Sequence, residues 1–114
     1  MNKLIDKATA HFESVLSQGL KGPIVVPEWD AEIYYKPSST MAEEAKIIEL
    51  SQAGKTTEAL VTTLIIKARD KDGNPLFDMA DRPRLMRAVD PAVILKVVTA
   101  FNADDTETQD ALGN

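Results

Sequence analysis

The sequence predicts a small α+β domain that is mostly helical. Apolar residues recur at helical spacing over most of the 114-residue chain, change to β-branched and aromatic residues between residues 23 and 36, and return to helical spacing after residue 40. A chain of this length builds one core. We therefore expect a single globular domain over residues 1–103, followed by a flexible acidic tail over residues 104–114.

The N-terminal helix is expected over about residues 2–18. Gly19 and Gly22 follow it, and glycine commonly ends helices. Its apolar residues lie three or four positions apart, so they would form one face of the helix; they are Leu4, Ile5, Ala8, Phe12, Val15 and Leu16.

A β-hairpin is expected over about residues 23–36. Residues 24–26 are Ile-Val-Val, and the second half of the hairpin carries both tyrosines of the chain; such residues favour strands. Pro27 lies between the two halves, where its fixed φ suits a turn. Because side chains alternate between the two faces of a strand, Tyr34 and Tyr35 cannot both face the same core.

Two helices are expected next. Thr40 and Glu43 form a capping-box pattern ahead of a helix over residues 41–53. After Gly54, a second helix contains the apolar run 59–66, for which a central strand is the alternative because the run is also rich in β-branched residues.

Two further helices follow a strong turn signal at residues 70–75. Asp78 or Asp81 can cap a short helix, and Asp90 with Pro91 forms an N-cap followed by a proline at the first helical position. We expect the hairpin to pack on helices that are centred near Ile48, Leu64 and Val97.

Composition narrows the range of partners. The formal net charge of −5 argues against a nucleic acid, because phosphates attract clustered Lys and Arg. No apolar run is long enough to span a membrane, and the first residues lack the apolar stretch of a secretory signal. The lack of cysteine fits a reducing compartment. We therefore expect a cytoplasmic protein with no membrane or nucleic-acid partner.

Motifs that could carry chemistry are incomplete. Residues 54–56 match the end of a phosphate-binding loop, but Glu49 stands where that motif has its first glycine. Asp70 starts a calcium-like spacing, but Pro75 replaces the required glycine. The sequence thus predicts a binding protein with no catalytic residue, metal or cofactor.

One alternative is a helix-turn-helix DNA-binding regulator. Residues 47–60 could form a helix, a glycine turn and a recognition helix beginning near Thr56. Thr62 and Thr63 argue against it, because they stand where the motif has buried aliphatic residues.

Three stretches resemble the tail assembly chaperones of long-tailed bacteriophages. They are the Val-Pro-Glu-Trp sequence at residues 26–29, the aromatic strand through Tyr35, and the Asp-Lys-Asp-Gly-Asn-Pro-Leu-Phe sequence at residues 70–77. The resemblance covers about residues 23–102. The Arg-Pro-Arg segment at residues 82–84 departs from it, since that helix is expected to be plainly acidic.

The resemblance implies a non-enzymatic chaperone of the host cell cytoplasm that is absent from the mature virion. Its implied partners are the tape measure protein, which it keeps soluble, and the tail tube protein, which it helps to recruit. Self-association stays open, and a structural head-tail virion component is a further alternative.

A partner helix would bind in a groove between side chains. The predicted surface combines the exposed parts of the hairpin aromatics with apolar residues of the following helix, namely Trp29, Tyr34, Tyr35, Met41 and Ile48. The alternative is that Trp29 and one tyrosine only fix the hairpin to the helices.

Overall fold

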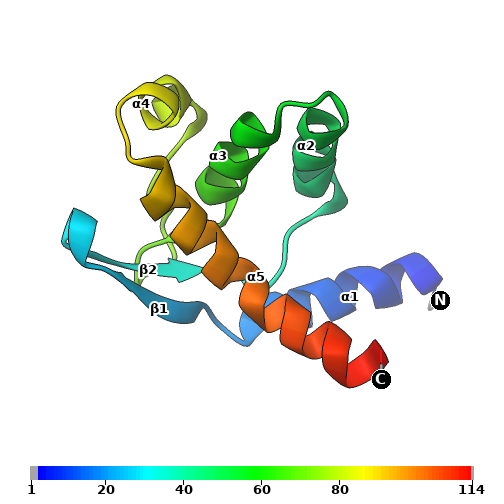
Figure 1. Ribbon diagram of the computed structural model, residues 1–114. Coiled ribbons are helices and arrows are strands. Elements are labelled where there is room, and N and C mark those ends of the chain that lie inside the picture. Colours follow the sequence, from blue (N-terminus) through cyan, green and yellow to red (C-terminus); the bar gives the residue numbers. More distant parts are fainter. Residues whose placement is uncertain (1–2, 114) are drawn as a thin grey trace.

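The computed structural model describes the backbone of residues 3–113 and the side chains of residues 3–103 (Figure 1). It confirms the predicted order of an N-terminal helix, a hairpin and four further α-helices in the described part. The elements are α1 (Leu4–Ser17), β1 (Lys21–Val26), β2 (Ala31–Tyr35), α2 (Met41–Gln52), α3 (Thr56–Lys67), β3 (Ala68–Arg69), α4 (Arg82–Arg87) and α5 (Pro91–Gly113), with short 3₁₀ turns η1 (Pro27–Trp29) and η2 (Met79–Asp81).

The sheet is antiparallel with strand order β1-β2-β3. Val25 pairs with Glu32 across the hairpin, and Tyr35 pairs with Ala68 of β3. Strand β3 was not expected from the sequence. This strand is two residues long and directly follows α3, so it has no alternating pattern of its own and exists only through its pairing with β2.

The core lies between the inner face of the hairpin and the two central helices, α3 and α5, as Figure 1 shows. The run at residues 59–66 is helical, and α2 and α4 flank α3. The most deeply buried side chains come from the hairpin, α3 and α5; they are Val26, Ile33, Val61, Leu64 and Val97.

The helix α2 lies outside this core. Its predicted capping box is present: Glu43 N donates to Thr40 Oγ1 at 3.2 Å, and Thr40 N donates to Glu43 Oε1 at 2.9 Å. The expected packing of the hairpin around Ile48 is wrong, because the Ile48 side chain is 45% exposed while α2 packs on α3. The helix therefore forms an outer layer.

The helix α1 has the predicted bounds, but the described part of the chain covers its apolar face only in part, at the half-buried Phe12 and Val15. It contains no buried residue, and Leu4 is 80% exposed. In Figure 1 it extends away from the hairpin and the central helices.

At the other end, α5 continues to Gly113, beyond the expected end of the globular domain. The side chains from residue 104 onward lie outside the described residues. The flexible acidic tail over residues 104–114 stays a prediction.

Buried threonines in α3 lead to a stability prediction. Thr63 Oγ1 donates to the Ala59 carbonyl at 2.9 Å, whereas Thr62 Oγ1 is buried with no hydrogen-bond partner among the described residues. An unpaired buried hydroxyl costs about 1 to 3 kcal/mol, so Thr62→Val should raise the free energy of unfolding by about 1 kcal/mol. Thr63→Val is the matched control and should give no such gain. Urea denaturation measures both, and equal effects would contradict the assignment.

Candidate partner-binding surfaces

The three predicted aromatic residues occupy different environments. Trp29 lies at the tip of the hairpin, half-buried, and its ring meets Phe77 edge-on at 6.3 Å between centroids. Tyr35 is buried and lies 4.9 Å from the Phe101 ring. Tyr34 is half-buried on the opposite face of β2. Trp29 and Tyr35 therefore fix the hairpin to the rest of the domain, and Tyr34 is the tyrosine that faces outward.

The two predicted residues of α2, Met41 and Ile48, are exposed. Figure 1 shows α2 beside α3 and away from the hairpin tip that carries Trp29. The five predicted residues therefore do not form one continuous patch, because one of them, Tyr35, lies in the core and two lie on a separate helix.

An apolar groove of about 380 Å³ lies beside Trp29, between the hairpin tip and the segment that leads into α4. Its lining contains no charged residue and consists of Trp29, Ala31, Ile33, Leu76, Phe77, Leu85 and Val89. Leu76 lies at the edge of the groove and is 40% exposed. Of this lining, only Trp29 was among the predicted site residues. Leu76 and Phe77 were not, although this Leu-Phe pair directly follows the turn at residues 70–75.

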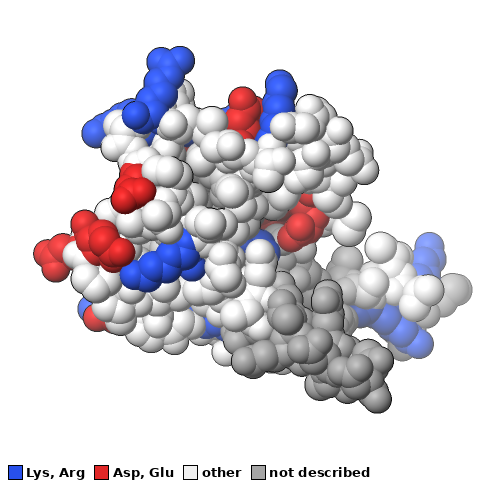
Figure 2. Space-filling view, viewed as in Figure 1, with Lys and Arg blue, Asp and Glu red and all other residues white. Residues whose placement is uncertain are grey.

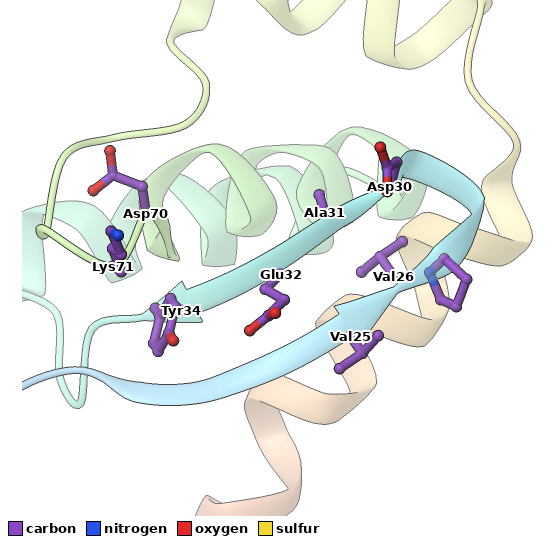
Figure 3. A pocket seen from close by; sticks show the side chains of 9 residues that line it. Val25, Val26, Asp30, Ala31, Glu32, Tyr34, Asp70 and Lys71 are labelled. Carbon is purple, nitrogen blue, oxygen red and sulfur yellow. The ribbon is translucent and has the colours of Figure 1, made fainter.

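A second hollow, of about 620 Å³, lies over the outer face of the hairpin (Figure 3). Figure 3 shows Val25, Glu32 and Tyr34 along the two strands, with Asp70 and Lys71 at one end. The two loop residues come close because the chain turns back there after pairing in β3, a contact that the sequence analysis did not predict.

Carboxylates dominate the rim of this outer hollow. Asp30, Glu32 and Asp70 line it together with one cation, Lys71. Backbone N–H groups hold the Asp70 carboxylate: Asn74 N and Asp72 N each donate to it at 2.9 Å and lower its pKa, which slight burial opposes. Asp30 and Glu32 do not take part in the ion pairs found among the described residues, whose acids are Glu28, Glu43, Glu44 and Glu58.

The hairpin is tied to its neighbours by two ion pairs. At the tip, Glu28 pairs with Lys96 of α5 at 3.2 Å; its own backbone N–H and then Lys96 lower the Glu28 pKa. At the other end, Lys36 contacts Glu43 at 2.8 Å. Burial raises the pKa of Glu43, but the Lys36 ammonium and the Thr40 N–H outweigh it and hold the pKa below its usual value. Both hollows thus lie on a hairpin of fixed position.

Other chemistry is sparse in the described residues. Residues 3–103 contain no group of three or more His, Cys, Asp or Glu side chains that could hold a metal ion. In the same part of the chain, no helix has the length and hydrophobicity to cross a bilayer.

The helix-turn-helix alternative conflicts with the position of α3. Six residues of this helix are buried, including Thr62 and Thr63, and helices α2, α4 and α5 pack around it. A recognition helix must expose one face to enter the major groove. The helix α3 is instead the centre of the domain.

Comparison with solved structures reveals a fold relationship. The structure of the bacteriophage HK97 tail assembly chaperone matches with a TM-score of 0.58 and 17% sequence identity, over 83% of this chain and 97% of the HK97 chain. The chain has the fold of a bacteriophage tail assembly chaperone. The resemblance seen in residues 26–29 and 70–77 is thereby confirmed for the fold. Neither a protein-family model nor a curated protein sequence matches the chain.

Proposed function

We propose that this protein is a non-enzymatic tail assembly chaperone that binds a helical segment of the tape measure protein in the host cell cytoplasm. The observation that carries the proposal is the shared fold with the HK97 protein, which spans nearly the whole of that chain. Recruitment of the tail tube protein and absence from the mature virion belong to the same proposal.

The apolar groove beside Trp29 is the surface that suits such a partner. An amphipathic helix binds by placing its apolar stripe in a groove of apolar side chains, and this groove has an all-uncharged lining. Trp29 and Phe77 support each other edge to face, so the groove is formed before the partner arrives. A preformed groove lowers the ordering cost of binding.

Leu76→Ala should weaken binding of the tape measure protein about 10-fold, because Leu76 is the half-exposed edge of the groove and contacts of this kind contribute about 1 to 2 kcal/mol. The chain is co-expressed with the neighbouring open reading frames, and the partner is recovered by pull-down. Titration of the recovered partner then gives the dissociation constant for the wild type and the variant. Leu95→Ala is the matched control, since Leu95 is comparably exposed on α5 and does not line the groove.

Tyr34→Ala separates the two hollows. If Tyr34→Ala weakens the complex and Leu76→Ala does not, the partner helix binds the outer face of the hairpin. If no tape measure protein is recovered with the wild-type chain, the chaperone function itself is contradicted. Recovery of the protein in purified particles would favour the structural virion component.

A further inference from the structure

The apolar groove beside Trp29 continues along α4. A neighbouring hollow of about 350 Å³ shares four lining residues with it, so the two form one continuous groove; the shared residues are Leu76, Phe77, Leu85 and Val89. Only the first hollow includes Trp29, and only the second includes Arg84 and Asp81. The groove is therefore apolar at the hairpin end and charged at the α4 end.

Arg84 is the cation at the charged end of the groove. It is exposed and does not take part in the ion pairs found among the described residues, whose bases are Lys36, Lys67, Arg82 and Lys96. The acid on the same wall, Asp81, is already engaged, because Asp78 N donates a hydrogen bond to its carboxylate at 3.0 Å. The Arg84 guanidinium is therefore left for a ligand.

The corner around α4 is basic although the protein is acidic. The net charge of the chain is −5, yet the six residues of α4 include three arginines and no acid. Arg82 pairs with Glu58, and Arg87 lines a different hollow. Figure 2 shows basic side chains projecting from the corner that α4 occupies in Figure 1, whereas acidic side chains gather near the hairpin tip. A negative group is therefore attracted to the α4 end of the groove and repelled from the hairpin end.

We propose that Arg84 selects partner helices that carry a carboxylate at one end of their apolar stripe. The helical form of the occupant rests on the proposed function, in which this groove binds a helical segment. The apolar stripe contacts Leu76 and Phe77, and the Asp or Glu of the partner pairs with Arg84, whose guanidinium can hold a carboxylate through two parallel hydrogen bonds. Packing in the groove supplies affinity, and the arginine supplies specificity for charge.

The experiment titrates two designed helical peptides into the full chain. Both peptides carry the same leucine stripe at helical spacing, and they differ only at one end of the stripe, where one has glutamates and the other has lysines. The wild type should bind the glutamate peptide about 10-fold more tightly, because like charges meet when the lysine peptide is bound. This preference should fall at high salt, since Arg84 is exposed and salt screens its charge.

Three variants separate charge from packing. Arg84→Glu should invert the preference, a result that a difference in helix stability between the two peptides cannot produce. Leu76→Ala should weaken both peptides equally, because Leu76 lines the shared part of the groove and carries no charge. Lys46→Glu makes the same change of net charge on α2, outside the groove, and should leave the preference unchanged.

Equal binding of the two peptides by the wild type overturns the proposal, as does binding of neither. So does an Arg84→Glu variant that still prefers the glutamate peptide. None of these results involves the tape measure protein. A chain that selects the glutamate peptide but recovers no tape measure protein on co-expression therefore keeps this site and loses the chaperone function. Recovery of the tape measure protein by a chain without charge preference keeps the chaperone function and contradicts the role of Arg84.

Discussion

Tyr35→Ala should lower the free energy of unfolding by about 3 to 5 kcal/mol, as expected when a large aromatic side chain is removed from a core. The Tyr35 ring is 7% exposed and stacks in a tilted geometry on Phe101, so alanine leaves a cavity between β2 and α5. A domain of this size has a total stability of only about 5 to 15 kcal/mol. The variant should therefore unfold at much lower urea concentration.

The adjacent residue provides the control. Tyr34→Ala removes the same side chain from the opposite face of the same strand, where it is half-buried against the outer hollow. Its cost should be about 1 kcal/mol, in the range of substitutions away from the core. Urea midpoints measured side by side give the comparison, and two equal losses of stability would refute the assignment of these faces.

This alternation shows what the sequence could predict. The period-two rule required Tyr34 and Tyr35 to face opposite sides, and the structure confirms it. The rule could not say which tyrosine is inside, because that depends on the side of the hairpin on which α3 and α5 pack. The capping box at Thr40 and the start of α5 at Pro91 could also be predicted, since both depend on residues only a few positions apart.

Features that depend on contacts between distant parts of the chain were harder to predict from the sequence. The pattern gave α2 an apolar face, yet α2 packs on one side of α3 and Ile48 stays half-exposed. Strand β3 has two residues and owes its existence to β2, which lies more than 30 residues earlier. The groove beside Trp29 likewise depends on distant residues, because Leu76 and Phe77 line it together with the hairpin tip. For the candidate site, the local sequence pattern predicted Trp29 and Tyr34. The residues that line the two hollows around them are brought there by tertiary contacts, so the sequence did not predict them.

Gly22→Ala should be the most damaging change at a surface position, with a loss of about 3 kcal/mol in the free energy of unfolding. Gly22 has φ of +111°, a conformation that L side chains rarely adopt. A Cβ atom there would also lie 2.9 Å from the Ile33 carbonyl oxygen and 3.3 Å from Tyr34 Cα. Both neighbours are backbone atoms of β2, so they cannot move without disturbing the hairpin.

A second glycine isolates the steric part of this loss. Gly19 also has a positive φ, +92°, but a Cβ atom built there meets nothing within 4 Å. Gly19→Ala should therefore cost only the backbone strain, about 1 kcal/mol, and the difference between the two variants measures the close approach of β1 to β2. Thermal denaturation of both variants checks it. Equal losses would mean that the hairpin yields at Gly22, so that the close approach of β1 to β2 adds no measurable cost.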